Sequence, residues 1–121
     1  MLCTTSYHFS GEIDMTIFNK LEEAVAAHQA GELDEAVRLY GTVLEAQPGN
    51  AVANYNLGVL SVGIQNLSAA LVLFRNAIDS NPDEKQYWLS YIDALLKDGQ
   101  SSNAEKAKKE ALARGISIGL G

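Results

Sequence analysis

The chain has very few of the residues that build covalent, metal or catalytic chemistry. Among its 121 residues there is one cysteine, Cys3, and there are two histidines, His8 and His28. A single cysteine excludes a disulfide within the chain and fits a reducing compartment such as the cytoplasm. The two histidines lack the spacing of metal ligands on one helix face. The sequence therefore predicts no metal site, no cofactor and no catalytic residue.

Basic residues are also scarce, which limits the kinds of partner. There are 9 Lys and Arg against 15 Asp and Glu, a formal net charge of -6. Residues 1–100 carry a net charge of -8 and residues 101–121 a net charge of +2. An acidic surface repels phosphate backbones, so nucleic acid is not an expected partner. Carboxylates such as Glu22 and Glu23 are expected on solvated helix faces rather than in an acid–base pair.

Long apolar stretches are absent as well. Asn, Gln, Ser or Gly interrupts each stretch before it reaches a bilayer-spanning length, so no membrane is expected as a partner. The first nine residues have no basic cluster and no long apolar core, and a secretory signal is not expected. The glycines of residues 115–121 follow an expected helix and precede no Lys-Ser or Lys-Thr, so they do not form a phosphate loop. These absences favour a cytoplasmic protein that is not an enzyme.

What the sequence does contain is an internal repeat of 34 residues. Five sets of positions keep this interval: Pro48 and Pro82; Ala36, Ala70 and Ala104; Gly31, Gln65 and Gly99; Tyr40 and Phe74; Val43, Ala77 and Ala111. Several independent positions with one spacing indicate a repeat architecture in which each copy packs on its neighbour.

The repeat resembles the tetratricopeptide family in its period and in its residue pattern. The best copy has Leu57-Gly58, Ala70, Phe74, Ala77 and Pro82 in the family's places. The resemblance covers roughly residues 17–115. It implies an all-α fold: a right-handed superhelical stack of about three antiparallel helix-turn-helix hairpins, an α-solenoid.

The helix and turn signals divide the chain accordingly. Helices are expected near 16–30, 33–46, 51–64, 67–80, 84–98 and 101–114, within repeats at about 17–50, 51–84 and 85–115. The repeat domain is then 16–115, residues 1–15 form an N-terminal extension whose order the sequence leaves open, and 116–121 form an apolar tail. This tail either folds back on the third hairpin, mediates pairing, or is the remnant of a longer protein.

Local signals predict how the helices end and pack. Gly31 and Gly99 suit the left-handed conformation that closes a helix. Asn81 and Pro82 predict a capped helix start, and Ser102 with Glu105 predicts a capping box. Among the packing residues, we expect Gly58 to face Ala70 and Ala77, since small residues let paired helices approach closely.

Binding residues are predicted on the first helix of each hairpin, which lines the concave side in stacks of this family. The candidates at helical spacing are Val25 and His28 in the first hairpin, Val52, Tyr55, Val59 and Val62 in the second, and Gln86, Leu89 and Asp93 in the third. An exposed apolar row indicates an interaction surface, unless neighbouring helices cover it. Asn56 stands where many family members grip a bound peptide's backbone, a role that its amide suits, although it equally fits a plain exposed side chain.

One family function is excluded by residue identity. Co-chaperone members hold a C-terminal carboxylate with a clamp of two lysines, two asparagines and an arginine, and of these only Asn56 is matched here. The other clamp places hold Leu21, Val25, Gln86 and Ser90. Without a cation the carboxylate has no strong partner.

The segment 87–95, Tyr-Trp-Leu-Ser-Tyr-Ile-Asp-Ala-Leu, looks like repeats that precede glycosyltransferase domains in bacterial proteins, which suggests a bacterial source. The main hypothesis is a protein-interaction scaffold that binds a peptide or helix of another protein. The alternatives are a structural module that self-associates, as a homodimer or head to tail, and a detached accessory part of a transferase system.

Overall fold

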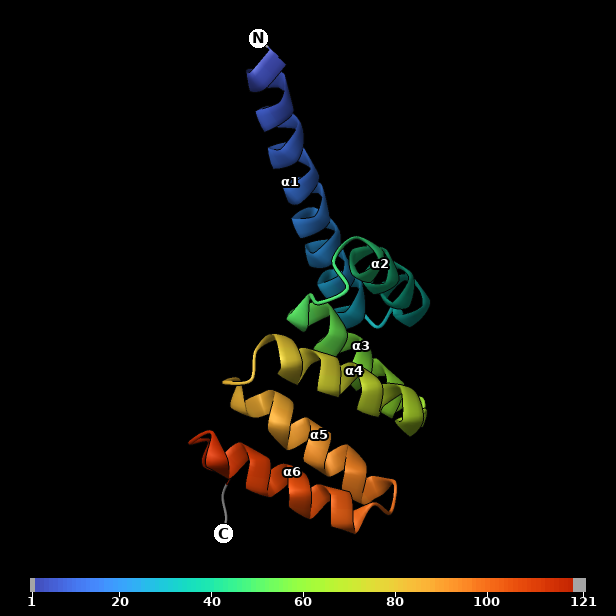
Figure 1. Cartoon of the computed structure of the whole chain (residues 1–121). Coiled ribbons are helices and arrows are strands. Elements are labelled where there is room, and N and C mark those ends of the chain that lie inside the picture. The colour runs from blue at the N-terminus through green and yellow to red at the C-terminus, as the bar shows by residue number, and fades with distance from the viewer. Residues whose placement is uncertain (1, 119–121) are drawn as a thin grey trace. The chain divides into compact units, whose positions relative to one another are not determined.

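The structure, a computed structural model, describes the backbone of residues 2–118 and the side chains of residues 15–118. The described residues form only α-helices joined by turns (Figure 1), so the predicted all-α fold class is confirmed. The helices are α1 (Leu2–Gln29), α2 (Leu33–Ala46), α3 (Ala51–Gly63), α4 (Leu67–Ser80), α5 (Lys85–Lys97) and α6 (Ser101–Ala113). None of the helices in this described part is long and apolar enough to cross a membrane.

The helices fall into two compact units. Unit 1 (residues 1–48) contains α1 and α2, and unit 2 (residues 49–121) contains α3 to α6. Each unit is built from antiparallel hairpins of the predicted kind, one in unit 1 and two in unit 2.

Unit 1 is a hairpin held by small residues and one buried aromatic. Ala24 and Ala27 of α1 are buried, as are Ala36, Tyr40 and Val43 of α2. The small alanines permit the close approach of the two helices, while Tyr40 fills the remaining space. The helix α1 begins at Leu2, well before the predicted start at residue 16. Cys3 and His8 lie among the residues whose side chains are not described.

In unit 2, the hairpins α3–α4 and α5–α6 are joined by packing of α4 on α5. The largest fully buried side chains are Phe74 and Ile78 of α4 and Trp88 of α5. The indole nitrogen of Trp88 donates a 2.7 Å hydrogen bond to the carbonyl oxygen of Pro82. A buried indole N–H needs such a partner, so this bond fixes the ring within the core.

Gly58 of α3 approaches the ring of Phe74 of α4 closely. A Cβ atom at Gly58 would lie 2.6 Å from Cε1 of Phe74, and its three nearest atoms all belong to that ring. The nearest neighbour of Gly58 is therefore Phe74, which was not among the residues expected to face it. Phe74 is large enough to reach across the hairpin, so the glycine makes room for a ring rather than for another backbone.

Two predicted helix caps were wrong, although α5 and α6 begin within one residue of the expected 84 and 101. The Asn81 N–H donates to the Ala77 carbonyl at the end of α4, and α5 begins only at Lys85, so Pro82 lies in the turn. The last helix begins at Ser101 with Gln100 as its N-cap and no side-chain cap. The caps that do form are Asn50, which accepts from the Ala53 N–H, and Asn66, which accepts from the Ala69 N–H.

The predictions for the turns at Gly31 and Gly99 are confirmed. Gly31 and Gly99 have φ angles of +80° and +76°, so both are in the left-handed conformation as predicted. Gln65, which holds the same place in the second repeat, has a φ angle of +63°. The geometry of the turn is therefore kept even where the repeat lacks glycine.

The apolar tail begins as part of the core of unit 2. Ile116 is buried in the same cluster as Ala107 and Ala111, and Ile118 packs against that cluster. Of the three alternatives for this tail, the structure places residues 116–118 back on the third hairpin. Residues 119–121 lie outside the described residues.

Candidate functional site

The predicted binding residues of unit 2 lie on α3 and α5. We call Val52, Tyr55, Asn56, Val59 and Val62 of α3, with Gln86, Leu89 and Asp93 of α5, the first-helix row. The helix α3 contains no charged residue. Val52 is 43% exposed and Val59 is 37% exposed, while Tyr55, Asn56 and Val62 are half-buried. An uncharged helix that leaves two valines in water has the composition of a contact surface.

Tyr55 links the two helices of this row. Its hydroxyl lies 2.9 Å from the Ser90 hydroxyl on α5, and the side-chain amide of Gln86 donates to the same Ser90 oxygen at 3.2 Å. The ring stacks on Tyr87 at a centroid distance of 4.8 Å and tilts against Phe74 at 5.5 Å. Burial raises the pKa of the neighbouring Tyr87 hydroxyl. Tyr55 is thus held by two ring contacts and by one hydrogen bond to Ser90.

The α5 part of the row is more polar. Gln86 and Asp93 are exposed and Leu89 is half-buried. Asp93 accepts an ion pair from Lys97 at 3.0 Å along the same helix. The structure therefore brings Tyr55 and Gln86 together through Ser90, a residue that the sequence noted only as a mismatch to the carboxylate clamp.

The two candidates in unit 1 are half-buried on α1. Nδ1 of His28 lies 3.2 Å from the Tyr40 hydroxyl, and the two rings meet edge to face at a centroid distance of 6.0 Å. Val25 lies one turn before His28 on the same helix. His28 is therefore positioned by a core tyrosine.

No group of three or more His, Cys, Asp and Glu suited to a metal ion occurs among the described residues.

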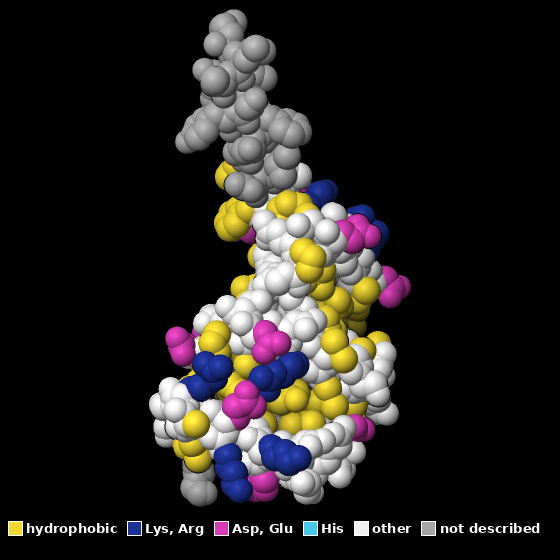
Figure 2. Space-filling model, viewed as in Figure 1, with side chains coloured by type: hydrophobic (Ala, Val, Ile, Leu, Met, Phe, Trp, Pro, Cys, Tyr) yellow, Lys and Arg dark blue, Asp and Glu magenta, His cyan; other side chains and the backbone are white. Residues whose placement is uncertain are grey.

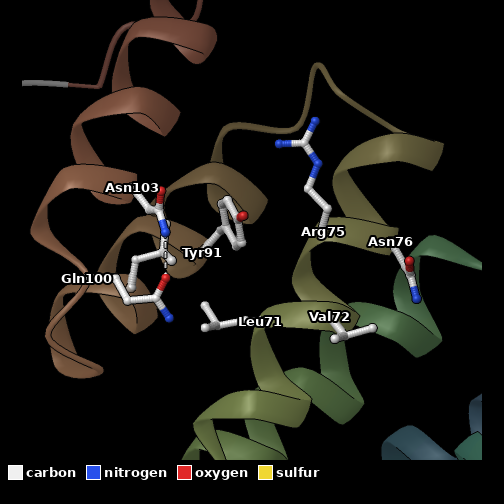
Figure 3. A pocket seen from close by; sticks show the side chains of 8 residues that line it. Leu71, Val72, Arg75, Asn76, Tyr91, Gln100 and Asn103 are labelled. Atoms are coloured by element: carbon white, nitrogen blue, oxygen red, sulfur yellow. Dashed lines mark hydrogen bonds between the residues drawn. The ribbon is translucent and has the colours of Figure 1, made fainter.

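A second surface feature of unit 2 was not predicted. A groove of about 380 Å³ lies between α4 and α6 over α5 (Figure 3), lined by Leu71, Val72, Arg75, Asn76, Tyr91, Leu95, Gln100 and Asn103. The guanidinium of Arg75 lies 5.8 Å from the ring centre of Trp88 and 6.0 Å from that of Tyr91. Figure 2 shows hydrophobic side chains of unit 2 bordered by charged side chains of both signs. Nothing in the repeat pattern singles out Arg75, because neither of the other copies has an arginine in its place.

The hairpin geometry and the repeat pattern define the class to which this protein belongs. The model of the tetratricopeptide repeat family matches residues 27–90, and the chain belongs to that family. None of the proteins with curated descriptions matches the chain significantly.

Solved structures with the same fold include three of different kinds. The O-GlcNAc transferase of Thermobaculum terrenum (a K341M mutant) is 28% identical over 83% of this chain and 19% of its own, with a TM-score of 0.73. MamA from AMB-1 is 24% identical over 84% of this chain and 57% of its own, with a TM-score of 0.72. The second tetratricopeptide domain of Spaghetti (RPAP3), bound to the HSP90 peptide SRMEEVD, is 16% identical over 84% of this chain and 92% of its own, with a TM-score of 0.72.

These similarities cover different shares of the other proteins and support different conclusions. The chain spans about a fifth of the transferase and little more than half of MamA. The transferase match agrees with the expected resemblance to repeat arrays that accompany transferase domains. Below 25% identity, MamA and RPAP3 establish the shared fold alone.

Proposed function

We propose that this chain is a protein-interaction module that holds an extended or helical segment of another protein on its first-helix row. The observation that carries the proposal is the exposure of Val52 and Val59 on a helix without any charge. Contact with a partner would remove these side chains from water. Each Å² of apolar area buried in this way would stabilise the complex by about 25 cal/mol. In unit 1, Val25 and His28 of α1 are the corresponding candidates.

The neighbouring polar groups suit a peptide partner. Asn56 lies beside Tyr55 on α3 and is half-buried, and an amide both donates to and accepts from a peptide backbone. Gln86 and Asp93 add exposed polar groups on α5. The RPAP3 domain with the same fold was solved with a peptide bound, which supports peptide binding as a use of the fold. The carboxylate clamp remains excluded because its cationic places hold other residues.

We also propose that the chain catalyses no reaction, needs no cofactor and works in a bacterial cytoplasm. Its support is the single cysteine, the lack of convergent catalytic groups in the sequence, and the resemblance to bacterial repeat arrays.

The test compares two substitutions of exposed apolar residues in one hairpin. Val59→Asp places a charge in the first-helix row, whereas Ile64→Asp places one in the α3–α4 turn, where Ile64 is 68% exposed. Circular dichroism confirms that both variants are folded, and affinity capture from a lysate of the source organism compares their partners. We expect a partner that the wild type and Ile64→Asp retain and that Val59→Asp loses. Equal capture by all three proteins would overturn the proposal.

A second candidate function is an accessory part of a transferase system that presents substrate proteins to a catalytic partner. It is favoured by the match to the O-GlcNAc transferase, which at 28% identity extends over 83% of this chain. The same capture experiment separates the candidates, because this one requires a transferase among the retained partners.

A further inference from the structure

The two units differ sharply in charge. Residues 1–48 contain eight Asp and Glu against two Lys and Arg, whereas residues 49–121 contain seven of each. Within unit 2 the cations gather on the last helix, where Lys106 and Lys109 are exposed. None of the ion pairs among the described residues involves either lysine. The chain thus has an acidic unit at one end of its sequence and a basic helix at the other.

Inside unit 2 the second hairpin covers one face of the third. Leu71, Val72 and Arg75 of α4 form one wall of the groove in Figure 3. The opposite wall, which we call the leading face of the third hairpin, consists of Tyr91, Leu95, Gln100 and Asn103. This arrangement shows how one hairpin of this sequence receives the second helix of the hairpin before it.

The first hairpin carries the same leading face two repeat periods earlier. The places of Tyr91, Leu95, Gln100 and Asn103 are taken there by Glu23, Ala27, Glu32 and Glu35. These four residues line a groove of about 400 Å³ with Ala26, Ala30 and Leu39, all of them from α1, α2 and the turn between them. In place of a neighbouring helix, this leading face offers a floor of small apolar residues and a rim of three carboxylates.

The last helix carries the complementary surface. One period after Leu71, Val72 and Arg75 come Glu105, Lys106 and Lys109 of α6. Leu112 takes the place of Ile78 in the same way. Ile78 is 1% exposed beneath α5, but Leu112 is 59% exposed. The helix α6 therefore presents an apolar residue and two lysines where α4 packs against the next hairpin.

We propose that α6 of one copy docks on the leading face of the first hairpin of a second copy, which continues the array head to tail. Arg75 lies 6.0 Å from the ring centre of Tyr91, and the equivalent pair across two copies is Lys109 with Glu23. Val72 lines the same groove as Gln100 and Asn103. In the proposed contact, Lys106 of one copy takes the place of Val72, and Glu32 and Glu35 of the other copy take the places of Gln100 and Asn103. The proposed contact between copies therefore repeats the contact between the second and third hairpins, but it places lysines of one copy against glutamates of the other.

The remaining charges at this contact are already paired within each copy. On α6, Glu105 accepts from Lys108 at 3.3 Å and Glu110 from Arg75 at 2.8 Å, which leaves Lys106 and Lys109 to determine the sign of the surface. On the receiving hairpin, Lys20 lies 3.7 Å from Glu23 and Arg38 pairs with Glu35, while carboxylates still outnumber cations. The contact uses a different patch on each copy, so it is heterologous and adds copies without closing into a dimer.

The test is a charge-reversal cycle read by sedimentation equilibrium at low ionic strength. We expect the weight-average mass of the wild type to rise with concentration beyond two chains and to fall towards the 13.0 kDa of one chain as salt screens the contact. Lys106→Glu/Lys109→Glu and, separately, Glu23→Lys/Glu32→Lys are each expected to remain at the mass of one chain. The matched control, Lys85→Glu/Lys97→Glu, changes the charge of unit 2 equally outside α6 and is expected to assemble.

Mixing the two reversed variants distinguishes a specific contact from a general charge effect. The acidic α6 of the first variant then meets the basic first hairpin of the second, and the unchanged ends also match, so assembly is expected to return in the mixture. A wild type that stays at 13.0 kDa, a wild type that stops at two chains, or a mixture that stays at one chain would overturn the proposal. Circular dichroism verifies that each variant is folded, and no residue of the first-helix row is substituted.

Discussion

The guanidinium of Arg75 on α4 donates two hydrogen bonds to the carboxylate of Glu110 on α6, at 3.1 Å and 2.8 Å. The two residues are 35 positions apart, so the pair ties the second hairpin to the third. The same guanidinium lies over Trp88 and Tyr91 and bonds Asp79 within its own helix. Arg75 is therefore a polar link between the two hairpins of unit 2, in addition to the hydrogen bond between Tyr55 and Ser90.

This pair predicts an acid-sensitive contribution to stability. The hydrogen bonds from Arg75 lower the pKa of Glu110 below its ordinary value of 4.5. A depressed pKa in the folded state stabilises the protein above the ordinary value, and the contribution is lost as the pH falls through the folded-state pKa. Because the Arg75 and Glu110 side chains are 36% and 40% exposed, solvent screening limits the contribution to at most about 1 kcal/mol.

Glu110→Gln should accordingly lower the free energy of unfolding at pH 7 by up to about 1 kcal/mol. The difference from wild type should shrink below pH 4.5. Urea unfolding at several pH values measures this difference. The control Glu105→Gln removes a more exposed carboxylate that pairs within α6, and it should have the smaller effect. An equal loss for the two variants at pH 7 would show that the link between hairpins adds nothing.

The second prediction concerns the close approach of Gly58 to Phe74. A side chain at Gly58 would collide with a buried ring, so Gly58→Val should destabilise the protein by about 1–3 kcal/mol. Gly41 also lies inside a helix, but a Cβ atom there would meet nothing within 4 Å. Gly41→Ala should therefore stabilise the protein by about 0.5–1 kcal/mol through helix propensity alone. Thermal unfolding of both variants tests the contrast, which fails if both substitutions shift stability in the same direction.

The repeat interval predicted the fold from small residues and turns. Ala36, Ala70 and Ala104 are all buried at the 34-residue spacing, and Gly31 and Gly99 both close helices. Positions with one dominant physical demand, a small volume or a positive φ angle, can be recognised in a single sequence because few residue types satisfy them.

Contacts between side chains that are far apart in the sequence could not be predicted in this way. The length of the Phe74 ring decides what Gly58 faces, and the carbonyl of Pro82 accepts from Trp88 in a turn that was expected to begin a helix. Tyr55 was predicted as a binding residue from its helical spacing, but its bond to Ser90 depends on how α3 meets α5. Such pairs are set by rotamers and by helix packing, which periodicity alone does not specify.

The third prediction separates the contribution of the Tyr55 hydrogen bond to stability from that of its ring contacts. Tyr55→Phe keeps the ring between Tyr87 and Phe74 and removes the bond to Ser90, whose oxygen still accepts from Gln86. The free energy of unfolding should fall by about 0.5–1.5 kcal/mol, the usual net value of one hydrogen bond. Chemical denaturation measures the loss. Tyr55→Ala removes the ring contacts too and should cost more, so similar losses for both variants would show that the ring does not support the row.

The last prediction contrasts two apolar residues at the end of unit 2. Ile116 is 8% exposed and belongs to the cluster formed by Trp88, Ala107 and Ala111, whereas Leu112 is 59% exposed. Replacing Ile116 by Ser removes apolar contacts and places a hydroxyl in that cluster, which should cost about 2–4 kcal/mol. Leu112→Ser removes a side chain that lies mostly in water in the single chain and should change stability by at most about 0.5 kcal/mol.

Unfolding must be measured at low protein concentration and high salt, where copies do not associate, because Leu112 is also part of the proposed contact between copies. Under those conditions only Ile116→Ser should lower the midpoint of denaturation. At high concentration and low salt, Leu112→Ser should instead lower the weight-average mass, since the exposed leucine would be buried there by a second copy. If Leu112→Ser destabilised the dilute protein as much as Ile116→Ser, Leu112 would be a core residue of the single chain, and its exposure would no longer support docking of α6.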